Sequence, residues 1–148
     1  MASWAEFESA EPEFAARARA LLATRKHLTM ATLRRDGSPR ISGTEVEFFE
    51  GQLRIGSMPD AVKANDLRRD RRVAIHGPTE DPPTGKESNW SGEAKVAGTA
   101  VEVDADGAGH RFHIDLQEVV VTSLSKDGHR LVIESWHPGR GYRRTERE

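Results

Sequence analysis

The sequence predicts a mainly β protein, a β-barrel with flanking helices, built as a single domain over residues 1–148. Short runs rich in β-branched and apolar residues fill most of the chain, and glycine-containing turn signals separate them at hairpin spacing. Helical periodicity is limited to two stretches, so helices do not alternate with strands as they do around a parallel sheet. These observations favour six or seven strands in an antiparallel barrel.

The first expected element is an amphipathic helix that starts close to residue 12. Its apolar residues recur at i, i+4, i+7 and i+8 and form one stripe: Phe14, Ala18, Leu21 and Leu22. Ser9 is the expected N-cap of this helix. Residues 1–8, which precede it, are expected to be flexible.

Seven segments are then expected to be strands: 27–33, 39–50, 52–57, 72–77, 93–103, 112–125 and 129–137. Asp36-Gly37 and Glu50-Gly51 join the first three into a meander, because tight hairpin turns need residues with positive φ. A further turn at 126–128 makes a hairpin of the last two. The proline-rich stretch 78–92 is expected to be a loop, and the tail 140–148 is expected to be flexible.

A second helix is expected at 57–69, directly after the third strand. Ser57 and Asp60 fit a capping box in which aspartate replaces the usual glutamate. The free N–H groups at such a helix start, together with the serine, suit an anion such as phosphate, which Lys63 and Arg40 could also reach. In the alternative interpretation Ser57 is a simple cap and Lys63 is solvated; both interpretations stay open on these residues alone.

Composition excludes several classes of function. Lysine and arginine total 22 against 24 acidic residues, a formal net charge of -2, which argues against a general nucleic-acid or anionic-membrane binder. The chain has no cysteine, so disulfides, thiolate metal sites and cysteine nucleophiles are excluded. No apolar stretch is long enough to span a membrane and no secretory signal opens the chain, so a cytoplasmic protein is expected.

Motifs for metal or hydrolytic chemistry are weak. His110-x-x-His113 has ligand spacing for a helix, but it lies next to an expected strand, so no metal site is expected. Asp104-x-Asp106-Gly107 is similar to the start of a calcium loop, but its flanking strands favour a plain turn. There is no Gly-x-Ser-x-Gly elbow, so no hydrolase nucleophile is visible.

Two segments carry a family resemblance. "MATLRRDGSPRISGTEVEF" and "LRIGSMPDAVKANDLRRDRRVAI" closely resemble the pyridoxamine 5'-phosphate oxidase-like superfamily of flavin-binding split barrels, nearest to its flavin/deazaflavin oxidoreductases of actinobacterial type. The resemblance spans about residues 14 to 137. It implies a six-stranded antiparallel Greek-key split barrel and a homodimer, with FMN or the deazaflavin F420 bound across the dimer interface.

The resemblance also implies a set of cofactor-binding residues: Arg40, Ser42, Thr44, Ser57, Met58, Lys63, Asn65, Trp136 and Arg140. The first three lie on the second expected strand and are assigned to the ring and ribityl chain. The next three are assigned to the phosphate. The last two would come from the second subunit. No residue is assigned a catalytic role.

One position departs from the family pattern. Relatives usually carry asparagine directly before the leucine of the second helix, whereas here Asp66 precedes Leu67. A carboxylate near a phosphate is unfavourable unless a neighbouring arginine, Arg68 or Arg69, neutralises it. The arginine cluster at this helix end could serve the anionic tail of F420, or it could simply complement the helix macrodipole.

The implied function is an oxidoreductase that transfers a hydride between the cofactor and a small organic substrate, with the cofactor supplying the chemistry. The 78–92 loop, with Trp90, would lie over the opening. An alternative on the same scaffold is a non-catalytic protein that holds haem, another tetrapyrrole or a flavin, with His76 and His137 as candidate haem ligands. An interaction module with a vacant cleft is the third possibility.

Overall fold

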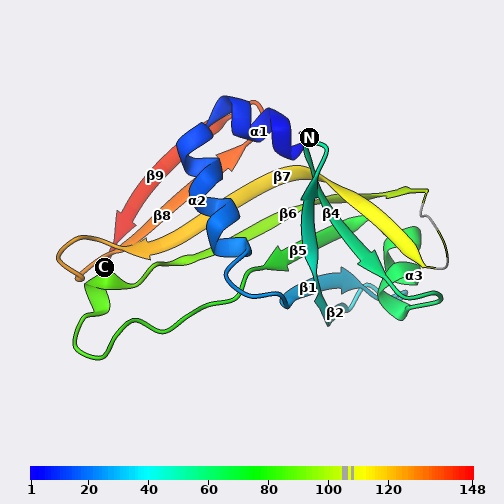
Figure 1. Ribbon diagram of the computed structural model, residues 1–148, viewed down its shortest axis with the longest axis horizontal. Helices are drawn as coiled ribbons and strands as arrows, with labels where there is room; N and C mark the ends of the chain where they lie inside the picture. Colours follow the sequence, from blue (N-terminus) through cyan, green and yellow to red (C-terminus); the bar gives the residue numbers. More distant parts are fainter. Residues whose placement is uncertain (105–106, 108) are drawn as a thin grey trace.

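The computed structural model spans residues 1–148 and describes all of them except residues 105, 106 and 108 (Figure 1). In the described residues the strands are β1 (Leu28–Leu33), β2 (Pro39–Thr44), β3 (Val46–Phe49), β4 (Gln52–Ser57), β5 (Arg72–His76), β6 (Glu93–Val103), β7 (His110–Leu124), β8 (Leu131–His137) and β9 (Gly141–Arg147). The helices are α1 (Trp4–Ala10), α2 (Pro12–Leu22) and α3 (Val62–Arg69), and η1 (Glu87–Asn89) is a short 3-10 turn in the segment 78–92.

The strands form one antiparallel sheet that closes on itself. Hydrogen-bonded neighbours follow the order β2-β1-β5-β6-β7-β4-β3. The two ends of this path, β2 and β3, are consecutive in the chain and are joined only by Glu45. Counted as one bent strand, they complete a ring of six strands, so the predicted six-stranded split barrel is confirmed.

The expected hairpins supply half of this ring. Residues 39–44 pair with β1 and residues 46–49 pair with β4. The expected strand 39–50 therefore bends at Glu45 and pairs with a different strand on each side of the bend. Gly37 has a φ of 86° and Gly51 a φ of 76°, the positive values that the turn signals predicted. Two further pairings, β1 with β5 and β4 with β7, join segments far apart in the sequence.

The C-terminal tail differs from the prediction. We expected residues 140–148 to be flexible because they offer little to bury, but residues 141–147 form β9, which pairs with β8 over its whole length. The edge of β8 supplies backbone hydrogen-bonding groups that satisfy those of the tail, whatever its side chains are. The charged side chains of β9 suit an outermost strand, because they discourage further pairing.

The N-terminus differs as well. We expected residues 1–8 to be flexible, but helix α1 begins at Trp4, with Ser3 as its N-cap. Ser9, the expected N-cap of the helix that starts close to residue 12, lies inside α1, and the N-cap of α2 is Glu11, which makes no side-chain cap hydrogen bond. Trp4 and Phe7 on this helix are 2% and 0% exposed. Both rings pack edge-on against other aromatic rings, including Phe14 of α2. The N-terminal segment is therefore part of the hydrophobic core.

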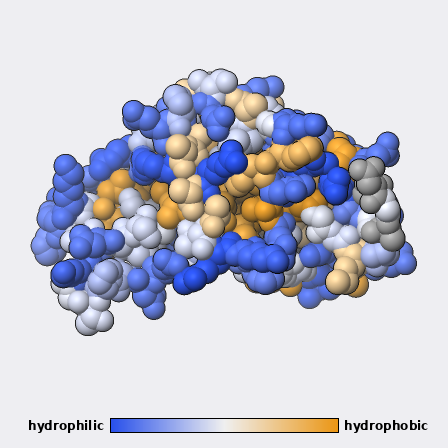
Figure 2. Space-filling view, viewed as in Figure 1, coloured by the Kyte–Doolittle hydropathy of each residue, from blue (hydrophilic) through white to orange (hydrophobic). Residues whose placement is uncertain are grey.

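Helices α1 and α2 lie together across one face of the β6–β7–β8 part of the sheet (Figure 1). On the face seen in Figure 2, hydrophilic side chains form the rim, and apolar side chains gather on both sides of α2. In the described part of the chain, no helix has the length and apolar character needed to cross a membrane.

Candidate functional site

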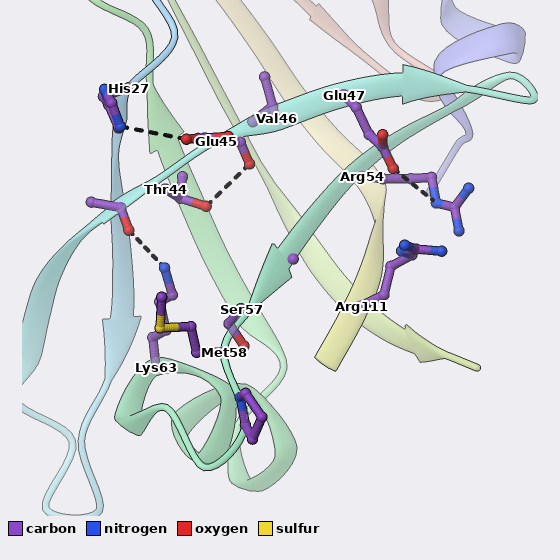
Figure 3. A pocket seen from close by; sticks show the side chains of 13 residues that line it. His27, Thr44, Glu45, Val46, Glu47, Arg54, Ser57, Met58, Lys63 and Arg111 are labelled. Carbon is purple, nitrogen blue, oxygen red and sulfur yellow. Dashed lines mark hydrogen bonds and ion pairs between the residues drawn. The ribbon is translucent and has the colours of Figure 1, made fainter. Parts of the chain in front are cut away.

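A cleft of about 610 Å³ lies where the β2–β3 bend, β4 and the start of α3 meet (Figure 3). Its volume is typical of pockets that hold cofactors and drug-sized ligands. Residues 43–47 form one wall of the cleft, and Gly56, Ser57 and Met58 form part of the opposite one. The bend at Glu45, which closes the barrel, therefore also shapes this cleft.

The helix beside the cleft begins later than predicted. We expected it to start at Ser57 with a capping box, but Ser57 is the last residue of β4 and α3 begins at Val62. Asp60 has a φ of 57°, a left-handed conformation that interrupts the helical geometry. Its backbone N–H donates to Nε2 of His110 at 3.3 Å. The N-cap of α3 is Ala61, without a side-chain cap hydrogen bond, so the expected capping box of Ser57 and Asp60 is absent.

Four of the predicted cofactor-binding residues do line this cleft: Thr44, Ser57, Met58 and Lys63. The Lys63 ammonium donates to the carbonyl oxygen of Gly43 at 2.8 Å, which ties α3 to the end of β2. The Ser57 hydroxyl is buried and has no hydrogen-bond partner among the described residues. A buried hydroxyl in this state is rare in native proteins and fits a ligand group that would complete it.

Two other predicted residues lie in a second cleft. Arg40 and Asn65 line a space of about 580 Å³ on the other side of α3, together with Arg34, Arg35 and Arg69. Ser42 lies on the same face of β2 as Arg40 but lines neither of these two clefts. The structure therefore does not bring the predicted set into one cavity.

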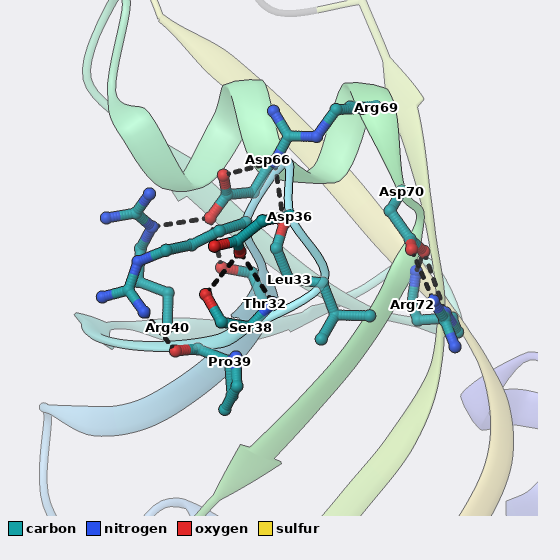
Figure 4. Close-up of polar contacts among 11 residues, drawn as sticks. Thr32, Leu33, Asp36, Ser38, Pro39, Arg40, Asp66, Arg69, Asp70 and Arg72 are labelled. Carbon is teal, nitrogen blue, oxygen red and sulfur yellow. Dashed lines mark hydrogen bonds and ion pairs between the residues drawn. The ribbon is translucent and has the colours of Figure 1, made fainter.

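The family departure at Asp66 has a structural explanation (Figure 4). Asp66 is 2% exposed and accepts hydrogen bonds from Thr32 at 2.7 Å, from Arg40 Nε at 2.7 Å and from Arg69 at 2.8 Å. Burial alone raises the pKa of Asp66, but the hydrogen bonds from Arg40, Thr32 and Arg69 outweigh it, so the pKa lies below its ordinary value. Arg40 and Arg69 thus neutralise the carboxylate, whereas Arg68 pairs with Glu102.

The C-terminal predictions have different outcomes. Trp136 is 6% exposed and its ring centroid lies 4.8 Å from that of Phe7, so it is a core residue and does not offer its ring to a cofactor. The alternation of β8 turns this position toward helix α1. Arg140 lies on the β8–β9 turn and bonds the ring of His137. Strands β8 and β9 are well separated from α3 (Figure 1), so Arg140 cannot serve the cleft of its own chain.

The candidate haem ligands, His76 and His137, and the 78–92 loop that was expected over the opening do not line the cleft. Nδ1 of His76 donates a hydrogen bond to the Gly77 carbonyl oxygen, His137 bonds Glu118, and neither histidine lines the cleft. Segment 78–92 does not border the cleft, and Trp90 donates instead to the Glu80 carbonyl. Among the described residues no group of three metal-ligating side chains gathers, and Asp106 of the predicted turn is outside those residues.

Sequence reasoning missed three basic side chains that line the cleft: His27, Arg54 and Arg111. Arg54 alternates with the buried Leu53 and Ile55, a signal that it faces away from the core. Arg111 reaches the cleft because β7 pairs with β4, and local patterns do not reveal a pairing between such distant segments.

The model of the pyridoxamine 5'-phosphate oxidase family matches residues 14–134 of the sequence. Among solved structures, PhzG from Burkholderia lata, in complex with tetrahydrophenazine-1-carboxylic acid, has a TM-score of 0.67 at 10% identity, covering 98% of this chain and 93% of that one. A pyridoxamine 5'-phosphate oxidase-related, FMN-binding protein from Nostoc punctiforme has a TM-score of 0.63 at 12% identity, covering 96% of both chains.

A haem-binding protein from Mycobacterium smegmatis has a TM-score of 0.56 at 14% identity, covering 88% of this chain and 86% of that one. At such identities these likenesses show a shared fold. A search of curated protein sequences finds no significant match.

Proposed function

This chain belongs to the pyridoxamine 5'-phosphate oxidase family, and from that membership we propose that it is an oxidoreductase that transfers a hydride between a bound flavin or deazaflavin and a small organic substrate. FMN is the cofactor we expect first, because a relative of the same fold is an FMN-binding protein. The deazaflavin F420 is the alternative. The PhzG relative holds a small carboxylic acid, which is consistent with a small organic substrate here.

The observation that carries this proposal is the donor set of the cleft. The Lys63 ammonium has three N–H donors and uses one on Gly43, so two remain for a phosphate. The buried Ser57 hydroxyl, which lacks a partner among the described residues, is a further polar group for the same ligand. These residues fit the phosphorylated end of a flavin.

Each part of the cleft then has a role in binding. Lys63 and Ser57 would hold the anionic end of the cofactor, and Thr44 with the 43–47 backbone would orient its middle. The cofactor, when bound, supplies the hydride chemistry. Arg40 engages Asp66 through Nε, and its two terminal nitrogens make no hydrogen bond among the described residues, so they remain donors for an anion in the second cleft.

We propose that the chain forms a homodimer and that the outer face of the sheet is the interface. The register places Ile41, Ala31, Ala74 and Ala97 in one row across β2, β1, β5 and β6. Ile41 is 74% exposed in the single chain. A row of small and apolar side chains with an exposed isoleucine is suited to contact with a second copy. In such a dimer Arg140 would be the residue to test as a contribution across the interface.

A haem-holding role is the second candidate, and one residue favours it. His27 lines the cleft, and an imidazole is a common axial ligand of haem iron. A relative of the same fold is a haem-binding protein.

A parallel titration of the purified protein with FMN, F420 and hemin, followed by fluorescence and absorbance, separates these proposals. Micromolar or tighter binding of FMN or F420, and no hemin uptake, is the expected result. A hemin complex with a Soret band that is lost in His27→Ala, without flavin binding, would establish the second candidate and overturn the first.

A further inference from the structure

The end of the cleft opposite Lys63 carries a second positive pole. Arg54 of β4 and Arg111 of β7 lie beside one another there, and both side chains border the cleft (Figure 3). We infer that Arg54 and Arg111 form a subsite for the anionic group, carboxylate or phosphate, of the small organic substrate. That the bound anion belongs to a substrate rests on the proposed function. The anion subsite itself rests only on the positions of Arg54 and Arg111.

The sheet register builds the pole. Arg111 lies opposite Gly56 in the β4–β7 ladder, and Arg54 lies two residues before Gly56 on the same strand. Residues two apart on a strand share a face, so Arg54 and Arg111 lie on the same side of the sheet. Gly56 has no side chain to occupy the space between them. A ligand group at this point would meet two guanidinium groups, with no side chain from position 56 between them.

The side chain of Arg54 is fixed in place by its surroundings, as expected of a residue that binds a ligand. Its side chain is only 14% exposed, and its guanidinium lies 4.9 Å from the Phe49 ring centroid, a cation–π contact that fixes its direction. The nearest carboxylate oxygen, on Glu47, is 3.9 Å from Nε, too far for a hydrogen bond. Among the described residues Arg54 makes no hydrogen bond, although a largely buried guanidinium needs acceptors.

The charges around the cleft also fit a monoanion or dianion at this end. Arg54, Arg111 and Lys63 face two carboxylates, Glu45 and Glu47. Glu47 is 57% exposed, so water screens its charge, whereas Arg54 is nearly covered. Glu45 lies 3.8 Å from the Lys26 ammonium, which offsets its charge. The pole at Arg54 and Arg111 therefore stays positive.

Calorimetric titration with three aromatic probes tests the subsite: benzoate, phenyl phosphate and the neutral benzamide. The FMN-loaded and the cofactor-free protein are both titrated, as wild type and as Arg54→Gln, Arg111→Gln and Arg111→Lys. Arg130→Gln, an exposed arginine on the distant β7–β8 turn, is the matched control. Circular dichroism verifies that every variant is folded, and Arg111→Lys keeps the charge if the glutamine variant does not fold.

We expect benzoate or phenyl phosphate to bind the wild type more tightly than benzamide. Each glutamine variant should weaken that binding by about 10- to 100-fold, with FMN affinity and the Arg130→Gln control unchanged. The preferred probe identifies the anionic group as carboxylate or phosphate. Equal anion binding in wild type and both glutamine variants would overturn the subsite.

Two further outcomes separate this inference from the proposed function. If the glutamine variants lose FMN affinity but keep riboflavin affinity, the pole holds the cofactor phosphate and the substrate subsite is wrong. If FMN and F420 fail to bind the wild type while anion binding still depends on Arg54 and Arg111, the anion subsite stands and the flavin proposal is wrong.

Discussion

Arg40 and Asp66 meet in a nearly buried ion pair, with Arg40 Nε 2.7 Å from Asp66 Oδ2. The pair joins β2 to α3 (Figure 4). Residues of both elements line each of the two clefts. It explains how an aspartate occurs beside a predicted phosphate site: its charge is neutralised inside the protein, by Arg40 and Arg69. Asp66 therefore positions Arg40 instead of repelling an anion.

Removal of the Asp66 charge should destabilise the fold. We expect Asp66→Asn to lower the free energy of unfolding by about 2–4 kcal/mol, because Arg40 and Arg69 lose a buried anionic partner. The pKa of Asp66 is lowered in the folded state, so this contribution is present above the unfolded-state pKa of about 4 and is lost as the pH falls through the lower folded-state pKa.

Urea denaturation of wild type and Asp66→Asn at neutral and acidic pH measures this loss. Asp70→Asn is the matched control, since the Asp70–Arg72 pair is exposed, with 74% of the arginine side chain accessible. The control should cost no more than about 1 kcal/mol. Equal losses in the two variants at neutral pH would contradict the structural role given to Asp66.

The phenol of Tyr142 should lose its proton at a higher pH than an ordinary tyrosine does. Burial, followed by its hydrogen bond to Glu134 at 2.5 Å, raises the pKa of Tyr142 to about 12. Because its folded-state pKa exceeds the unfolded value of about 10, its contribution to stability is complete below pH 10 and is lost as the pH rises through about 12.

Tyr142 is the only tyrosine in the chain, so ultraviolet absorbance of tyrosinate reports on this residue alone. The native protein should show one transition close to pH 12, and Tyr142→Phe should show none. A transition at pH 10 in the folded protein would mean that the contact with Glu134 is absent in solution.

Gly98 should not tolerate a side chain. It lies at the bulge between β6 and β7, where an added Cβ would be 2.0 Å from the Asp115 carbonyl oxygen. We expect Gly98→Ala to lower the midpoint of thermal unfolding, with a loss of about 1–3 kcal/mol from overpacking. Gly43→Ala is the control, because an added Cβ there meets no atom within 4 Å. Similar midpoints for both variants would place the bulge elsewhere.

Local signals in the sequence were enough for most strands and hairpins. The turns at Gly37 and Gly51 have the positive φ that their Asp-Gly and Glu-Gly pairs require. Local patterns predicted a barrel, and the family resemblance then specified the six-stranded split barrel. Local patterns could not show how the barrel closes, because closure needs the β1–β5 and β4–β7 pairings.

Helix α1 was missed although its signals are present. Ser3 precedes Trp4 and Phe7, two apolar residues three apart, which is a capped amphipathic pattern of a single face. The segment is only seven residues long, and such helices depend on tertiary packing for stability. Its aromatic partners, Phe48 and Trp136, are distant in the sequence, so their contact could not be predicted from local patterns.

The cofactor site was predicted in part for the same reason. Thr44, Ser57 and Lys63 lie close together because the bend after β2 faces the start of α3. Arg40 was assigned to the same ligand but is turned toward Asp66, a partner that depends on the packing of α3 against β1.

The affinity for FMN of the wild type and of Lys63→Ala, measured by flavin fluorescence, tests the central claim that this cleft binds a flavin through Lys63. We expect the variant to bind FMN more weakly by about 1.5–3 kcal/mol, which is about 10- to 150-fold, with riboflavin binding unchanged. Lys126→Ala, a substitution in the turn before β8, should leave FMN affinity as it is. Equal FMN affinities for the wild type and Lys63→Ala would contradict the assignment of this cleft.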